Sequence, residues 1–199
     1  MKRIAVFASH GGSNLQAIID GCCAGKINAE VVVVISNNQD AYALERAKNA
    51  GIPGICINKK INGNSLNEEM LRLLILHNVD MVFLAGYLKK LPNNILREYK
   101  DRIYNIHPSL LPKYGGKGMF GVNVHKAVLE AGEKESGATI HKVVGEYDTG
   151  EIISQKKVPV LDGDTPDTLA KRVLEAEHEL IVETLTCFCV RSEAVQIPC

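Results

Sequence analysis

The segment Asn105-Ile106-His107-Pro108 carries the residue types best suited to chemistry in this chain. It continues an apolar stretch that predicts a short strand, and side chains two residues apart on a strand project to the same side. Pro108 fixes its own φ and biases His107 away from helix. An imidazole moves protons near neutral pH, and a carboxamide N–H stabilises an oxygen that gains negative charge. The pair indicates attack on a carbonyl-like carbon, although a His-Pro dipeptide alone is common.

A glycine-containing segment, Ser9 to Asn14, separates the first expected strand from the first expected helix. Its glycines let the backbone approach an anion, and the free N–H groups and dipole of a helix start favour a phosphate there. The segment is neither a dinucleotide fingerprint nor a P-loop, so a single phosphate fits it best. A tight turn with Ser13 as the helix N-cap explains the same residues equally well.

Asp148 lies in the turn-rich segment 146–150. A carboxylate beside His107 would favour the imidazolium and orient the ring, but a simple turn also accounts for this residue. A metal site is the competing use of the histidines, with the ligand set His107, His125, His141 and Asp148. Their spacing matches no metal signature, so no metal is expected.

Apolar runs alternate with amphipathic stretches over the first half of the chain. Buried strands are expected at 4–8, 31–35, 55–57, 81–85 and 103–106, and helices at 15–23, 41–50 and 67–76. This order predicts an α/β fold with a mainly parallel twisted sheet and helices on both faces. Beyond Lys113 we expect a helix at 122–131, an antiparallel strand pair at 139–144 and 151–160, and a final helix with Thr165 as N-cap and Pro166 first.

Composition narrows the class of protein. The 199 residues are 46% hydrophobic and contain no linker, so we expect a single domain over 1–199. Lys plus Arg and Asp plus Glu number 23 each, which disfavours a nucleic-acid partner. No apolar run is long enough to span a membrane, and the first one ends too soon for a signal peptide. A cytoplasmic location and reduced cysteines are therefore expected.

Several blocks of sequence, in order, resemble the phosphoribosylglycinamide formyltransferase family, the folate-dependent enzymes of purine biosynthesis. The blocks are SHGGSNLQAII at 9–19, SN at 36–37, LAGYLKKL at 84–91, NIHPSLLPKYGGKG at 105–118, SGATIH at 136–141, YDTGEII at 147–153 and AEHEL at 176–180. The similarity covers roughly residues 1–185. It implies a Rossmann-like formyltransferase fold, with a phosphate- and nucleotide-binding half (1–100) and a catalytic and folate-binding half (101–190).

The resemblance also implies an activity. It is the transfer of a formyl group from 10-formyltetrahydrofolate, a co-substrate, to the amine of glycinamide ribonucleotide. The products are formylglycinamide ribonucleotide and tetrahydrofolate, in de novo purine biosynthesis. Attack of the amine on the formyl carbon would give a tetrahedral intermediate, and no metal is required. Both partners are small molecules, and a monomer and a homodimer are equally compatible with the sequence.

The same resemblance implies roles for individual residues. Asn105, His107 and Asp148 would be the catalytic trio, with protonated His107 helping to bind the oxyanion. Gly12, Ser13 and Asn14 would bind the substrate phosphate, and Glu177 its sugar or glycinamide end. The folate site would be formed by Leu88, Lys89, Lys90, Leu91, Asn105, Val144, Gly145, Glu146, Tyr147 and Asp148.

Two features depart from the family pattern, and three alternatives compete with it. The segment 62–67 lacks an Arg that many members use for the nucleotide, and Lys89 replaces an Arg, whose planar fork it lacks. A methionyl-tRNA formyltransferase would carry an added carboxy-terminal RNA-binding domain, and a formyltetrahydrofolate hydrolase would carry an added amino-terminal regulatory domain. A nucleotide-binding module without turnover is the non-enzyme alternative, and the presence of Asn105, His107 and Asp148 argues against it.

Overall fold

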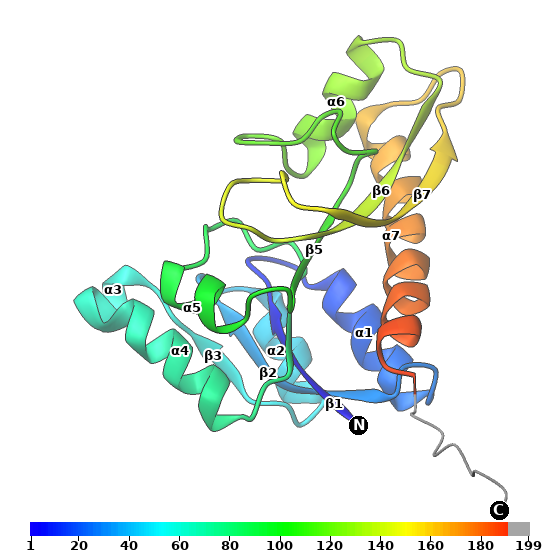
Figure 1. Ribbon diagram of the computed structural model, residues 1–199. Helices are drawn as coiled ribbons and strands as arrows, with labels where there is room; N and C mark the ends of the chain where they lie inside the picture. The colour runs from blue at the N-terminus through cyan, green and yellow to red at the C-terminus, as the bar shows by residue number, and fades with distance from the viewer. Residues whose placement is uncertain (191–199) are drawn as a thin grey trace, which may run out of the picture.

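The computed structural model describes residues 1–190 (Figure 1). Its centre is one seven-stranded sheet in the order β3-β2-β1-β4-β5-β6-β7. The strands are β1 (Lys2–Phe7), β2 (Ala29–Ser36), β3 (Gly54–Cys56), β4 (Met81–Leu84), β5 (Ile103–His107), β6 (Glu135–Lys142) and β7 (Ile152–Pro159). The first five are parallel, whereas β6 runs antiparallel to both β5 and β7.

Seven α-helices are found within residues 1–190. They are α1 (Ser13–Cys23), α2 (Tyr42–Asn49), α3 (Lys59–Asn62), α4 (Leu66–Leu76), α5 (Asn93–Glu98), α6 (Val122–Glu130) and α7 (Pro166–Phe188), and a short 3₁₀ turn, Gly63–Ser65, joins α3 to α4. In Figure 1, α6 and the adjoining ends of β6 and β7 stand above the parallel strands.

Alternating side chains of the strands build a core on each face of the sheet. Ile4 and Val6 of β1 pack in one cluster with residues of α1, α2 and α7. Ala5 and Phe7 face the other way and pack with residues of α4 and α5. Because both faces of these strands are covered, their central residues, such as 4–7 of β1 and 31–35 of β2, form uninterrupted apolar runs, as parallel strands usually do. A third cluster joins α6 to β7 and the first half of α7.

The topology creates a crevice at one edge of the sheet. β1 and β4 are neighbours, yet the chain leaves β1 toward β2 and reaches β4 only after β3. The connections on either side of this pair therefore diverge, and ligands of α/β proteins commonly bind at such a point, beyond the carboxyl ends of the strands. The segments following β1, β4 and β5 all meet there.

The expected α/β fold and the antiparallel pair are confirmed, with two short helices missed. α3 begins where the Asn58 side chain accepts a hydrogen bond from the Ile61 N–H, and α5 begins directly after Pro92. Helices of four and six residues are too short to show a helical period. Thr165 caps α7 as expected, in a capping box. The expected N-cap at Ser13 is wrong, because Gly12 takes that position and Ser13 is already helical.

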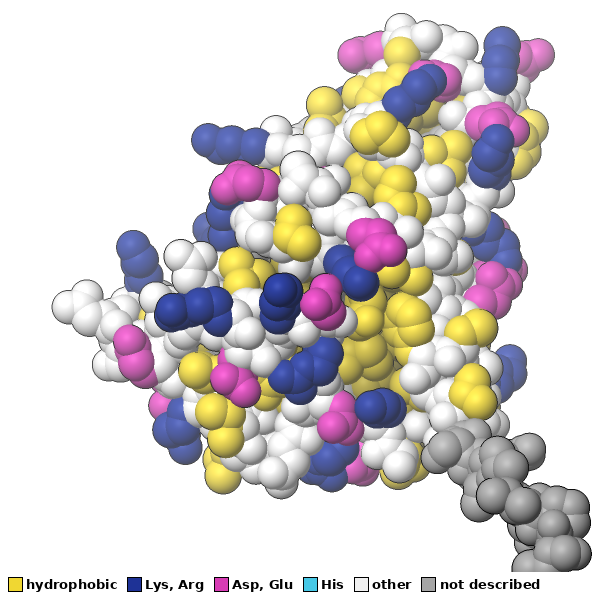
Figure 2. Space-filling view, in the orientation of Figure 1, with side chains coloured by type: hydrophobic (Ala, Val, Ile, Leu, Met, Phe, Trp, Pro, Cys, Tyr) yellow, Lys and Arg dark blue, Asp and Glu magenta, His cyan; other side chains and the backbone are white. Residues whose placement is uncertain are grey.

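The surface charges, the helices and the cysteines are next compared with the expectations from composition. Basic and acidic side chains are interspersed over the face drawn in Figure 2. No helix within residues 1–190 is long and apolar enough to cross a membrane. Five cysteines of this part of the chain are free thiols, as expected: Cys22, Cys23, Cys56, Cys187 and Cys189. The tail or strand expected from Arg191 onward lies outside the described residues.

Candidate active site

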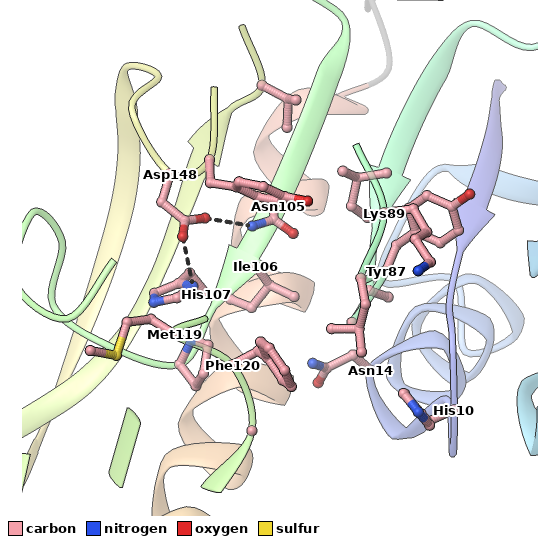
Figure 3. Close-up of a pocket in the computed structure, with 18 of the residues that line it drawn as sticks. His10, Asn14, Tyr87, Lys89, Asn105, Ile106, His107, Met119, Phe120 and Asp148 are labelled. Carbon is pink, nitrogen blue, oxygen red and sulfur yellow. Dashed lines mark hydrogen bonds and ion pairs between the residues drawn. The ribbon is translucent and has the colours of Figure 1, made fainter. Parts of the chain in front are cut away.

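A cavity of about 770 Å³ occupies the crevice at the carboxyl ends of the strands. Its walls come from the segments after β1, β4 and β5, from the turn between β6 and β7, from the loop before α6, and from α7. This volume lies in the range of small-molecule sites. Figure 3 shows Asn105, His107 and Asp148 on one side of the cavity and His10 and Asn14 across from them.

The three predicted catalytic side chains meet at one end of this cavity. Asn105 Nδ2 lies 3.5 Å from Asp148 Oδ1, and His107 Nδ1 lies 3.6 Å from Asp148 Oδ2. Asn105 and His107 project from the same side of β5, as the period of two predicted. Asp148 reaches them from the β6–β7 turn in a left-handed conformation, with φ 56°. Sequence separations of about 40 residues are thus closed by the sheet.

His107 is held between two acceptors. Its Nε2 donates to the Tyr114 carbonyl at 2.8 Å, and its Nδ1 faces the Asp148 carboxylate. Burial lowers the pKa of His107 below its ordinary value, although Asp148 and the Tyr114 carbonyl oppose that shift. Without substrate, burial therefore outweighs the carboxylate that was expected to favour the imidazolium. Both ring nitrogens nevertheless face acceptors, so a second proton has a place to bind when negative charge develops nearby.

Asp148 remains ionised in this setting. Burial raises its pKa, but the nearby His141 and His107 and the Gly116 N–H together lower it below the ordinary value. The Gly116 N–H donates to Asp148 Oδ2 at 2.8 Å. The carboxylate thereby links Asn105 and His107 to the glycine-rich loop that precedes α6.

His141, which the sequence suggested only as a ligand of the competing metal site, is also a member of this cluster. Its Nδ1 donates to the Lys142 carbonyl at 2.8 Å, which leaves Nε2 to accept from Asn105 Nδ2 at 3.0 Å. Antiparallel pairing sets His141 directly opposite Asn105. That register was the missing signal, because it cannot be read from the chain. One amide N–H of Asn105 is thus committed to His141, and the other makes only the long contact with Asp148.

The predicted phosphate-binding residues form another wall of the same cavity. Gly12, Ser13 and Asn14 line it at the start of α1, where Gly12 has φ 70° and no side chain caps the helix. Glu177 of α7 also lines it and is 7% exposed. Burial raises the pKa of Glu177 to about 7, and a hydrogen bond from Asn14 opposes the shift. An anion and a hydroxyl-bearing group could be held side by side here.

Most of the predicted folate-site residues line the cavity near the catalytic cluster. Those that do are Leu88, Lys89, Lys90, Leu91, Gly145, Glu146 and Tyr147. Lys90 Nζ bonds Glu146 Oε2 at 2.8 Å and lies 5.2 Å from the Tyr147 ring centre, so the β4 and β6–β7 segments are tied together. Val144 is the exception: it is 62% exposed and is not among the lining residues.

Several lining residues were not predicted. They are apolar or aromatic: Tyr87, Leu96, Met119, Phe120 and Val143. The buried His125, suggested by the sequence only as a metal ligand, lines the cavity as well. Tyr87 follows the end of β4, where the rule for parallel sheets could have placed it. The others sit on helices and loops whose faces the sequence does not orient. No group of three or more potential metal ligands is found within residues 1–190.

The mainly parallel sheet has a ligand-sized cavity at its switch point and a polar cluster at one end of that cavity, and these features define a Rossmann-like α/β fold with a candidate active site. Comparison with known proteins then gives the family. Residues 2–185 match the family described as "Formyl transferase". The chain belongs to the formyl transferase family.

Individual relatives agree with this assignment. The chain is 47% identical over 191 residues to "Phosphoribosylglycinamide formyltransferase, chloroplastic" of Arabidopsis thaliana, with 94% of this chain and 65% of that protein covered. It thus spans slightly less than two thirds of that plant relative. "Phosphoribosylglycinamide formyltransferase" of Escherichia coli is 39% identical, with 93% and 86% covered. The solved glycinamide ribonucleotide transformylase 1 of Symbiobacterium toebii superimposes with a TM-score of 0.87 at 40% identity, covering 95% and 88%.

Proposed function

We propose that this protein is a phosphoribosylglycinamide formyltransferase, which moves a formyl group from 10-formyltetrahydrofolate to the amine of glycinamide ribonucleotide. The observation that carries the proposal is one cavity with two chemically different walls. Asn105, His107 and Asp148 form a proton-transfer and oxyanion-binding cluster on one wall, and the glycine loop at α1 offers an anion site on another. The names of the relatives point to the same acceptor and to transfer of the same formyl group.

Binding follows from the chemistry of each wall. The N–H groups of Gly12, Ser13 and Asn14 and the start of α1 bind the nucleotide phosphate. Glu177 forms a hydrogen bond, as donor or as acceptor, with the sugar or the glycinamide end of the nucleotide. The pterin of the co-substrate lies between the Leu88–Leu91 segment and the turn 145–148, where apolar walls and free backbone groups suit a flat heteroaromatic ring.

The catalytic cluster handles charge and one proton. As the amine attacks, a new N–C bond forms and the formyl oxygen gains negative charge. The second N–H of Asn105 binds that oxygen. The proton that the amine loses passes through a water to the pair of His107 and Asp148. It makes an imidazolium whose positive charge stabilises the oxyanion, and the Asp148 carboxylate stabilises that charged ring. That proton ends on the folate nitrogen when its bond to the formyl carbon breaks.

We also propose a domain organisation, a metal requirement and a location in the cell for this protein. The protein acts as a single domain on small molecules, needs no metal, and works in the cytoplasm. The family alternatives differ in the acceptor of the formyl group. A hydrolase would release formate without any amine, and a methionyl-tRNA formyltransferase would require a charged tRNA.

A spectrophotometric assay separates these possibilities. The purified protein is given 10-formyltetrahydrofolate with glycinamide ribonucleotide, with no acceptor, or with methionyl-tRNA. Tetrahydrofolate formation that requires glycinamide ribonucleotide supports the proposal. Formate release without an acceptor indicates a hydrolase, transfer only to methionyl-tRNA indicates that enzyme, and no turnover in any mixture indicates a binding module.

A further inference from the structure

The loop at the start of α1 has little of its own to hold its shape. Gly12 adopts a left-handed conformation, no side chain caps the helix, and the first turn contains no acidic residue. Within residues 1–190, the N–H groups of Gly12, Ser13 and Asn14 donate to no backbone carbonyl. A loop of this kind is free to bind an anion, but something outside it must keep those donors in place.

The neighbouring helix α2 supplies that support along three consecutive residues of the loop. The Ala43 N–H donates to the His10 carbonyl at 3.0 Å. Arg46 Nε donates to the Gly11 carbonyl at 2.8 Å. Gly12 lies so close to α2 that an added Cβ would stand 2.8 Å from the Ala43 Cβ. The loop is therefore pressed against one face of α2.

These contacts fix where the loop's donors point. The peptide bonds on either side of Gly11 are trans, since the one cis bond within residues 1–190 is Leu111-Pro112. In a trans peptide the carbonyl and the N–H point in opposite directions. Because the His10 and Gly11 carbonyls face α2, the N–H groups of Gly11 and Gly12 face away from it, and both glycines line the cavity.

Arg46 is itself held in place on two further sides. Its Nη1 donates to Gln16 Oε1 at 3.0 Å, and its guanidinium lies 5.0 Å from the centre of the Tyr42 ring. Gln16 in turn donates to Asp20 on the same face of α1. A guanidinium with fixed geometry beside a glycine loop brings a permanent positive charge next to the backbone donors.

We propose that Arg46 is a positioning residue for the substrate phosphate. Its hydrogen bond to the Gly11 carbonyl turns the loop N–H groups toward the cavity, and its charge favours a phosphate monoester dianion over a neutral group. The inference rests on the proposed function for the identity of the substrate but not for the anion itself. It also gives the chain a cation beside the phosphate loop, whereas segment 62–67 contains no Arg.

The test compares Arg46→Ala, Arg46→Lys and the control Lys48→Ala, which removes an exposed charge from the same helix. Loss of a charge-assisted hydrogen bond predicts a KM for glycinamide ribonucleotide raised about tenfold to a hundredfold in Arg46→Ala. The KM for 10-formyltetrahydrofolate and kcat should change less than about threefold. Arg46→Lys should fall between wild type and Ala, because Lys can reach one acceptor but lacks the fork. Lys48→Ala should match wild type.

A second measurement uses inorganic phosphate alone, which separates this inference from the proposed function. Phosphate should raise the melting temperature of the wild type and of Lys48→Ala, and should do so much less for Arg46→Ala. That result in a protein without formyl transfer would sink the proposed function and leave this inference standing. Equal rises in both KM values, a lower melting temperature with unchanged KM, or equal phosphate effects in wild type and Arg46→Ala would each overturn it.

Discussion

The two working walls of the cavity achieve recognition in opposite ways. At the end of β1, the Gly11–Asn14 loop offers backbone N–H groups, and its side chains contribute little. At the end of β5, the proposed chemistry depends on the side chains of Asn105, His107 and Asp148. Asn105 hydrogen-bonds to His141 and to Asp148, and the Asp148 carboxylate faces His107 and His141. A backbone site needs a conformation, whereas a side-chain site needs particular atoms. Substitutions should therefore affect binding at the first wall and chemistry at the second.

The difference also extends to how each wall is supported. The loop at the start of α1 is held by α2, a helix that packs on the parallel part of the sheet. The catalytic cluster is held by the antiparallel strands β5 and β6 and by the β6–β7 turn. Within that turn, Gly150 lies so close to Lys142 that an added Cβ would stand 1.8 Å from its carbonyl oxygen. The turn that delivers Asp148 is thus as tightly packed as the loop that delivers the N–H groups.

The largest expected effect is at the carboxylate. Asp148→Asn keeps the shape of the side chain but removes the charge that stabilises a protonated His107. We expect kcat to fall about a hundredfold to ten-thousandfold, the usual range for losing acid–base help. The KM for glycinamide ribonucleotide should stay within a few-fold. Asp162→Asn, at an exposed turn, serves as the control. Wild-type turnover in a folded Asp148→Asn protein would show that the cluster of Asn105, His107 and Asp148 does not carry out the chemistry.

The next effect concerns the amide. Asn105→Ala removes the proposed oxyanion donor and should lower kcat about a hundredfold to a thousandfold with little change in either KM. The exposed Asn49→Ala, at the end of α2, is the matched control. A rise in KM with unchanged kcat would instead place Asn105 among the ground-state binding residues, and the contrast between the walls would fail.

At the backbone wall the expected change is in binding. Gly12→Ala forces an L-residue into φ 70° and puts a Cβ 2.8 Å from Ala43 Cβ. Strain of this kind costs about 1–3 kcal/mol, so the KM for glycinamide ribonucleotide should rise about fivefold to a hundredfold. Gly25→Ala is the matched control, because Gly25 has φ 69° but open space around it. Equal KM values for the two variants would mean that contact with α2 does not shape the loop.

The sequence predicted these two walls to different degrees. The apolar runs of β1, β2 and β4 predicted these strands, because buried parallel strands are apolar on both faces. The pair Asn105 and His107 followed from a period of two within one strand. The glycines indicated an anion loop but not that α2 supports it, since a contact between Arg46 and Gly11 spans 35 positions. No local pattern encodes a contact of that kind.

The position of His141 was harder to predict for a related reason. Its place opposite Asn105 depends on strand register, and β6 has an irregularity at Ile140/His141 where it pairs with β7. A shift of one residue would turn the ring to the other face of the sheet. For Asp148 the residues alone left open both a simple turn and a carboxylate beside His107, and only the family resemblance implied a place in the catalytic trio. Side-chain sites assembled from several strands thus need the fold, or a resemblance to a known family, before they can be recognised.

The smallest expected effect is on the pH dependence of stability. It concerns Glu177, which lines the cavity beside the loop at the start of α1. Burial raises the pKa of this carboxyl group from 4.5 to about 7, so the folded state holds its proton more tightly than the unfolded state does. Between these two pH values the folded state binds more protons, and stability from this group falls as pH rises, by up to about 1.4 kcal/mol per pH unit. Glu177→Gln cannot titrate. Plots of unfolding free energy against pH, from urea denaturation without substrates, should therefore fall more steeply for wild type than for Glu177→Gln between about pH 4.5 and 7. Parallel curves would mean that Glu177 is ionised throughout, and that Asn14 and the start of α1 stabilise its charge as they would a phosphate.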